Sequence, residues 1–202
     1  MNYSICVSGA AAGESVDHSH TLAERLGKAI AKSGHVLTTG ATVGLPFYAA
    51  QAASKAGGLS IGFSPATSLR EHVHKYRLPI GVFNFINFTG LHYVGRDVYL
   101  VQSSDAVITV GGRFGSLHEF TTALESNMPC GVLTGSGGVA DMIPGLLDKL
   151  KAPNKHLIVI DDNPETLVEK IIQLLDTQIG YIDTVSLSHE WYLKKDSAKR
   201  SG

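Results

Sequence analysis

Arg96 and Glu119 are the two side chains whose types and placement in this sequence favour chemistry. Arg96 stands before the short apolar run Ala106–Val110, and Glu119 comes soon after the glycine-rich segment Gly111–Ser116 that follows this run. An arginine holds a phosphate or a carboxylate through two parallel hydrogen bonds. A carboxylate beside the anomeric carbon of a sugar stabilises an oxocarbenium-like centre or acts as nucleophile or base. The pair therefore suits cleavage of the N-glycosidic bond of a nucleotide.

The same two residues also have a simpler interpretation. Glu119 follows the loop closely enough to be an acid near a helix start, where the helix dipole favours a negative charge. Arg96 is then its ion-pair partner or an ordinary surface residue. His118, which directly precedes Glu119, is expected to point elsewhere on the helix. Spacing alone does not decide between this interpretation and the catalytic one.

Short apolar runs alternate with longer amphipathic ones, and this alternation must position both residues. Apolar strands followed by helices indicate a parallel sheet that is buried on both faces. We expect an α/β fold: a single doubly wound Rossmann-like domain, with a mostly parallel sheet of six or seven strands, over residues 1–175. Residues 176–202, which include Trp191, are expected to form a partly disordered appendage, with a contact surface for a partner as a weaker alternative. The predicted strands are Ser4–Val7, Val36–Thr39, Leu59–Phe63, Val82–Phe85, Ala106–Val110, Gly131–Leu133 and Leu157–Ile160. The predicted helices are Ser19–Ser33, Pro46–Ala56, Val94–Ser103, Ser116–Ser126, Val139–Leu150 and Pro164–Leu175, with residues 64–81 irregular.

Four loops rich in small residues follow predicted strands, at the sheet edge where such folds bind ligands. They span residues 8–13, 40–44, 111–116 and 135–138. Glycine permits the close approach of a ligand, and helix N-termini offer free N–H groups to an anion. None of the loops matches GxGxxG or GxxxxGK[ST], which disfavours ordinary dinucleotide and P-loop sites. We expect a small-molecule nucleotide or sugar-phosphate ligand, with plain turn chemistry as the alternative. The candidate contacts are Gly9, Gly40, Gly44, Gly111, Gly112, Arg113, Gly115 and Ser116.

The segment GRDVYLVQSSDAVITVGGRFGSLHEFTTALESNMPCGVLTG, with TTGATVGLPFYAAQAASKAGG before it, resembles the LOG (Lonely Guy) family, and the similarity extends over most of residues 3–175. The family pattern places an arginine on a helix before Pro-Gly-Gly-x-Gly-Thr-x-x-Glu, and Arg96 and Glu119 fall on its arginine and its glutamate. The resemblance implies hydrolysis of AMP or an N6-modified AMP to the free base and ribose 5-phosphate. Gly112, Gly115 and Ser116 would then surround the phosphate.

This chain departs from the family pattern at three positions. Gly111 replaces the proline, Ser116 replaces the threonine but keeps the hydroxyl, and Arg113 stands where the second glycine is expected. Arg113 either binds a second phosphate or blocks the pocket. The downstream segment LTGSGGVADMIPGLLDKL resembles sister groups that include molybdenum-cofactor-carrier-like proteins. The alternative function is therefore non-catalytic binding of a nucleotide or of the molybdenum cofactor, since the fold does not by itself secure an activity.

Composition narrows the other classes of function. The formal net charge of -1 gives no electrostatic basis for binding nucleic acid, and no run is apolar for the length of a membrane span. Two cysteines in predicted strands suit a reducing compartment, so we expect a cytoplasmic protein. His72 and His74 have no third ligand nearby, so we expect no metal site but exposed loop histidines, with a phosphate contact as the alternative. We expect no cofactor, because the glycine loops hold no lysine for pyridoxal phosphate.

The resemblance also has an implication for assembly. Relatives in the LOG-like groups form dimers or larger assemblies, so we expect a homodimer or a higher homo-oligomer. The predicted helices over 94–103 and 116–126 flank the expected ligand edge and are the candidate interface.

Overall fold

The computed structural model describes residues 2–152 and 154–179, and within them it contains a seven-stranded sheet in the order β4-β3-β2-β1-β5-β6-β7. Every neighbouring pair of strands is parallel. The predicted doubly wound parallel α/β domain is confirmed. The strands are β1 (Ser4–Gly9), β2 (Val36–Thr39), β3 (Ser60–Ser64), β4 (Phe85–Phe88), β5 (Ala106–Val110), β6 (Cys130–Leu133) and β7 (Ile158–Asp161). The helices are α1 (Glu14–Lys32), α2 (Leu45–Lys55), α3 (Leu69–His74), α4 (His92–Gln102), α5 (Phe114–Glu125), α6 (Gly138–Lys149) and α7 (Pro164–Ile179), with a 3-10 turn at Lys155–Leu157.

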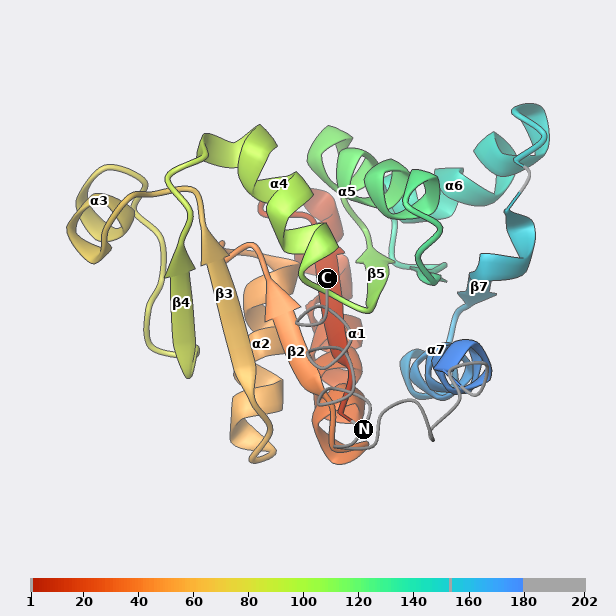
Figure 1. The fold of residues 1–202 in the computed structure, drawn as a ribbon, viewed down its shortest axis with the longest axis horizontal. Coiled ribbons are helices and arrows are strands. Elements are labelled where there is room, and N and C mark those ends of the chain that lie inside the picture. The colour runs from red at the N-terminus through yellow and green to blue at the C-terminus, as the bar shows by residue number, and fades with distance from the viewer. Residues whose placement is uncertain (1, 153, 180–202) are drawn as a thin grey trace, which may run out of the picture.

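The two central strands define where a ligand can bind. The chain builds β1 to β4 outward in one direction and then returns to place β5 on the other side of β1 (Figure 1). Strand order therefore reverses between β1 and β5. In open parallel sheets the loops that leave such a switch point diverge, and the crevice between them is the usual ligand site.

Alternate residues of the central strands face two different layers of helices. Ile5 and Val7 of β1 belong to a buried cluster with α1, α2 and α7, whereas Cys6 belongs to a cluster with α4, α5 and α6. All five residues of β5 are buried. A strand covered on both faces needs this near-continuous apolar sequence. For this reason the strand could be predicted from the sequence.

Two elements differ from the sequence prediction. The strand expected over Val82–Phe85 lies at Phe85–Phe88, because the side chain of Asn84 takes the place of a ladder bond: its Oδ1 accepts a hydrogen bond from Ser60 N–H at 2.9 Å. The segment expected to be irregular contains α3. Its N-cap Ser68 accepts a hydrogen bond from Glu71 N–H at 3.3 Å, and the Glu71 carboxylate accepts one from Thr67 N–H at 2.7 Å. The Ser-x-x-Glu spacing of a capping box is the sequence signal for this helix.

Two helices, α1 and α7, also extend beyond their predicted bounds. α1 begins at Glu14 rather than Ser19, and α7 continues to Ile179, past the expected domain boundary at residue 175. The remainder of the predicted appendage, residues 180–202 with Trp191, lies outside the described residues. Among residues 2–152 and 154–179, no helix is long and apolar enough to cross a membrane.

Helices α1 and α2 approach each other closely at Gly27. A Cβ built on Gly27 would lie 2.0 Å from the Ala49 carbonyl oxygen, a separation that only a shift of the α2 backbone could relieve. These two helices follow the loops at residues 10–13 and 40–44, so their spacing also sets how those loops approach each other.

We predict that Gly27→Ala destabilises the protein by ~1–3 kcal/mol, because overpacking against a backbone exceeds the gain in helix propensity. Gly145→Ala is the matched control. Gly145 is also inside a helix, but nothing lies within 4 Å of the added carbon, so a gain of roughly 0.5–1 kcal/mol is expected. Thermal unfolding of both variants measures the difference. Equal melting temperatures would contradict the close approach of α1 and α2.

Candidate active site

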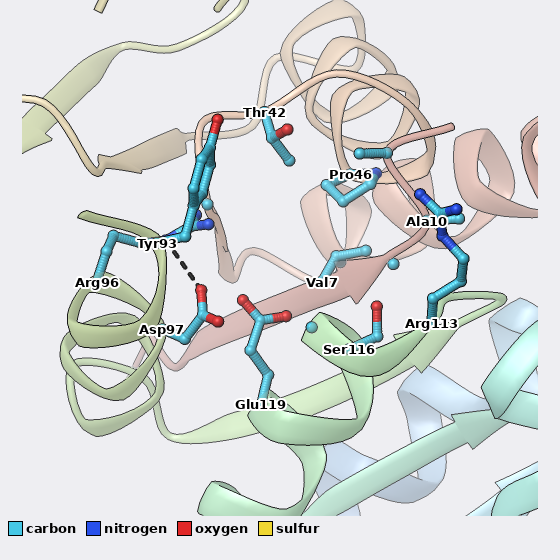
Figure 2. Close-up of a pocket in the computed structure, with 14 residues that line it drawn as sticks. Val7, Ala10, Thr42, Pro46, Tyr93, Arg96, Asp97, Arg113, Ser116 and Glu119 are labelled. Atoms are coloured by element: carbon cyan, nitrogen blue, oxygen red, sulfur yellow. Dashed lines mark ion pairs between the residues drawn. The ribbon is translucent and has the colours of Figure 1, made fainter. Parts of the chain in front are cut away.

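A pocket of about 260 Å³ opens at the carboxyl edge of β1, β2 and β5 (Figure 2). It therefore lies at the switch point of the sheet, where the fold predicts a ligand site. Its walls come from the loops after these strands and from α4 and α5. The lining residues are Val7, Gly9, Ala10, Ala11, Gly40, Thr42, Pro46, Tyr93, Arg96, Asp97, Arg113, Gly115, Ser116 and Glu119.

Most of the residues that the sequence singled out meet in this pocket. Arg96 and Glu119 both line it, although they come from different helices. Five of the eight predicted ligand contacts line it as well, namely Gly9, Gly40, Arg113, Gly115 and Ser116. The other three, Gly44, Gly111 and Gly112, are not lining residues.

The loops that form the pocket are held against each other by Gly44, Gly111 and Gly112. A Cβ on Gly44 would lie 2.2 Å from the Ala10 carbonyl oxygen, so this glycine lets two of the loops pack together. The Gly111 N–H donates to Ser136 Oγ at 2.7 Å, and the Gly112 carbonyl accepts from Val139 N–H at 3.0 Å. The loop at residues 135–138 is therefore hydrogen-bonded to the loop after β5. The carbonyl groups of the loop after β5 accept hydrogen bonds from the start of α6, so these N–H groups are not available to a ligand.

The N-terminus of α5 faces the pocket with free donors. The first intrahelical bond runs from Leu117 N–H to the Arg113 carbonyl at 2.9 Å. The N–H groups of residues 114–116 precede this bond and have no backbone partner among the described residues. Of these residues, Gly115 and Ser116 line the pocket. Unpaired N–H groups and the helix dipole make such an end an anion site.

Glu119 lies in the second turn of α5, beyond the positions that the helix dipole favours. Its side chain is buried, with 8% exposure, and Ser8 donates a hydrogen bond from Oγ to Glu119 Oε2. The pKa of Glu119 is raised to about 7: burial is the main cause and the neighbouring Asp97 adds to the rise, while the Arg96 charge and the Ser8 hydrogen bond oppose it. The interpretation of Glu119 as a first-turn acid that suits the helix dipole is therefore wrong. A pKa in this range is the one that suits a general acid or base at neutral pH.

Arg96 pairs with its neighbour Asp97 rather than with Glu119. Its Nε lies 3.1 Å from Asp97 Oδ1, and both side chains are buried. Nη1 donates to the Phe63 carbonyl at 3.3 Å. The guanidinium also fills the space above Gly40, where a Cβ would lie 1.5 Å from Nη1. Gly40 therefore contributes by leaving room for the arginine.

Asp97 joins the pocket to the surface through a second pair. Its Oδ2 lies 3.2 Å from Nδ1 of His118, whose side chain is 37% exposed. His118 does not itself line the pocket, but it contacts a residue that does. Asp97 thus lies between a buried cation on one side and a half-exposed imidazole on the other.

Sequence reasoning missed Ser8, Thr42, Pro46, Tyr93 and Asp97. Ser8 and Asp97 each adjoin a residue that was singled out, which was the available signal. The histidine expectation also fails at His72, which is buried and not exposed. Its Nδ1 meets Ser64 Oγ at 2.8 Å and its Nε2 meets the Pro79 carbonyl at 2.9 Å, so it braces the segment around α3. Among the described residues, no group of three or more His, Cys, Asp or Glu side chains is arranged to hold a metal ion.

Comparison with known proteins places the chain in a family. The model of the SLOG cluster4 family matches residues 2–168, and this chain belongs to that family. This confirms the resemblance to LOG-like proteins that the sequence suggested. An uncharacterised protein of Archaeoglobus fulgidus is 33% identical over 114 residues, which cover 56% of this chain and 70% of that protein.

Two solved structures are similar over most of their length. The molybdenum cofactor binding protein of Rippkaea orientalis has a TM-score of 0.70 and 28% identity, with 87% of this chain and 98% of that chain covered. The molybdenum cofactor carrier protein of Chlamydomonas reinhardtii has a TM-score of 0.67 and 26% identity, with 87% and 99% covered.

The raised pKa of Glu119 predicts a pH-dependent difference in stability. An unfolded glutamate titrates near 4.5, and the buried Glu119 titrates near 7. Between these values the unfolded chain has lost a proton that the folded protein retains, so stability falls as the pH rises through this window. Glu119→Gln removes the titration. We expect the melting temperature of Glu119→Gln minus that of the parent to increase from pH 4.5 to 7 and to stay constant above pH 7.

Glu125→Gln is the matched control, since Glu125 is an exposed glutamate of the same helix. Its melting temperature should follow that of the parent across the same pH range. A Glu119→Gln difference that stays flat between pH 4.5 and 7 would show that Glu119 ionises in the folded protein as it does in water.

Proposed function

We propose that this protein is a nucleoside 5′-monophosphate phosphoribohydrolase that cleaves AMP or an N6-modified AMP. The observation that carries the proposal is the position of Glu119. A buried carboxyl with a pKa of about 7 lies at the base of a pocket whose side is an open helix N-terminus. Binding an anion would not require an acid there, and a carboxylate would weaken such binding. An acid that titrates near neutral pH is what hydrolysis requires.

The pocket has a natural place for a 5′-phosphate. Gly115 and Ser116 line it at the start of α5, and the Ser116 side chain packs against Gly112. Arg113 stands on the same side, and Figure 2 shows its side chain rising along the wall rather than across Glu119. A phosphate bound here would meet N–H donors, a hydroxyl and a guanidinium. The ribose would then lie over Glu119.

The reaction follows from that placement. The bond between C1′ and the base nitrogen breaks, and its electron pair leaves with the base, which takes up a proton. A water oxygen bonds to C1′ and gives a proton to the Glu119 carboxylate, which then releases it to solvent; solvent water supplies the proton that the base takes up, so the protons balance. The negative charge of Glu119 also stabilises the oxocarbenium-like centre. Arg96 holds Asp97 and supplies further donors to the ribose or phosphate.

Chromatography of AMP and N6-isopentenyl-AMP incubated with the protein tests the proposal. We expect free base and ribose 5-phosphate from the parent, and a loss of about 100-fold or more for Glu119→Gln, because a general base is removed. Activity should rise with pH through about 7, since the ionised carboxylate is the active form. Glu125→Gln should retain full activity. Equal turnover by Glu119→Gln would refute the mechanism.

A second candidate function is the carriage of a nucleotide-like or molybdenum cofactor without turnover. The similarity to a molybdenum cofactor binding protein and a carrier protein favours it, as does Arg113, which adds a positive charge for an anionic cargo. AMP that binds and stays intact in the same assay would favour this candidate. Base release gained by Arg113→Gly would favour it further.

We also propose that the protein is a homo-oligomer that associates through α4 and α5. Both helices expose large apolar side chains, with Val94 on α4 70% exposed and Phe114 on α5 89% exposed, and grouped apolar surface of this kind is typical of an interaction site. Light scattering of the parent should give a mass above that of one chain, and Val94→Asp should shift it toward the monomer. Met142→Asp, at an equally exposed apolar position on α6, should leave the mass unchanged. A monomeric parent would rule out the assembly.

A further inference from the structure

Tyr93 forms the side of the pocket opposite the start of α5. Its side chain lines the cavity and is 47% exposed. Figure 2 shows its ring standing on the α4 side, while Ser116 and Arg113 stand on the other side and Glu119 lies between. An aromatic face that is open to solvent inside a pocket is a surface on which a planar ligand group can stack.

The ring of Tyr93 is held in place before any ligand arrives. Tyr76, which follows α3, packs edge-to-face against it with ring centroids 5.5 Å apart and an interplanar angle of 86°. The Tyr76 hydroxyl lies 2.8 Å from Nδ1 of His92. The Arg96 guanidinium carbon lies 5.9 Å from the centroid of Tyr93, within the range of a cation–π contact. The ring is thus fixed by groups from two separate segments.

The backbone before Tyr93 supports the same conclusion. His92 has a φ of 55°, a left-handed conformation that is unfavourable for a residue with a side chain. Such a conformation persists where surrounding contacts enforce it, and it is found more often at binding sites than elsewhere. Here the His92 N–H donates to the Pro65 carbonyl at 3.2 Å, and its ring meets Tyr76. The left-handed backbone at His92 therefore helps to set the direction in which the Tyr93 side chain projects from α4.

The order of groups across the pocket matches the order of parts in a nucleotide. The anion-binding end of α5 is on one side, Glu119 is at the base, and Tyr93 is on the other side. Thr42 and Pro46 also line the pocket, with a hydroxyl and an apolar ring. With a 5′-phosphate at α5 and the anomeric carbon over Glu119, the base extends toward Tyr93.

We propose that Tyr93 binds the heteroaromatic base of the nucleotide by stacking, and thereby selects a nucleoside monophosphate over a sugar phosphate that has no base. The inference rests on the proposed function for the placement of the phosphate at α5 and of the anomeric carbon over Glu119. It makes Tyr93 a determinant of affinity for the base, distinct from the residues that break the bond. A stacking contact accepts different bases, since each has an aromatic face, so N6-modified bases fit the same surface.

Calorimetric binding of AMP and of ribose 5-phosphate, in the full-length Glu119→Gln protein, tests the inference without turnover. We expect the added change Tyr93→Leu to weaken AMP binding about tenfold and to leave ribose 5-phosphate binding within about twofold. Tyr93→Phe should retain AMP binding, because it keeps the aromatic face. Tyr99→Leu is the matched control, since Tyr99 is a similarly exposed tyrosine of α4 outside the pocket, and it should change neither affinity.

The outcomes separate this inference from the proposed function. Unchanged AMP binding in Tyr93→Leu, or an equal loss for both ligands, would overturn the stacking role even if the parent releases base. A selective loss of AMP binding supports the role even if the parent releases no base, in which case only the hydrolase proposal fails. A protein that binds neither ligand would overturn both.

Discussion

The arrangement around this pocket depends on one constraint: a carboxyl is buried at a sheet edge that is otherwise built to attract anions. Glu119 can occupy that place because Ser8 donates to it and the guanidinium of Arg96 lies on the other side of Asp97. Each of these partners arrives on a different element. Parallel pairing of β1 with β5 brings Ser8 to the start of α5, and α4 carries Arg96 and Asp97 to the same edge. Loss of any one element would leave a buried charge without compensation, which is costly.

The glycine loops divide into two kinds of structural role. Some bring backbone to the ligand side of the pocket, as at Gly115, where α5 begins with free donors. Others allow the loops to pack on one another. Gly111 and Gly112 connect the loop after β5 to Ser136 and to the start of α6, so the Gly111 N–H and both carbonyl groups are already used. These contacts hold the start of α5, and with it Glu119, in place beside the other loops, and a reaction that relies on positioning needs such rigidity.

The hydrolase and carrier hypotheses share most of this geometry and differ in what the acid does. Both require an anion site at α5 and a polar wall on α4. Only hydrolysis requires a carboxyl that changes protonation near neutral pH beside the anomeric carbon. Similar architecture occurs in a molybdenum cofactor binding protein and in a molybdenum cofactor carrier protein. A family fold of this kind accommodates either role, and the side chains at the edge decide between them.

Much of the fold was predictable because the physics is local. Apolar strands such as Ala106–Val110 alternate with amphipathic helices, and this order specifies a parallel sheet with its loops at one edge. Local reasoning failed at β4, where the Asn84 side chain replaces a ladder bond, and it overlooked the capping box of α3. Both cases involve side chains that compete with regular backbone hydrogen bonding.

At the site, the sequence alone identified Arg96, Glu119 and the loop between β5 and α5, because residue type and motif spacing are properties of the chain. Tertiary structure alone decided the rest. It paired Arg96 with Asp97 instead of Glu119, placed Ser8 against Glu119, and assigned Gly111 and Gly112 to support. The physical reason is that a pKa and a hydrogen-bond partner depend on which distant segments exclude water from a group, and spacing along the chain carries no record of that.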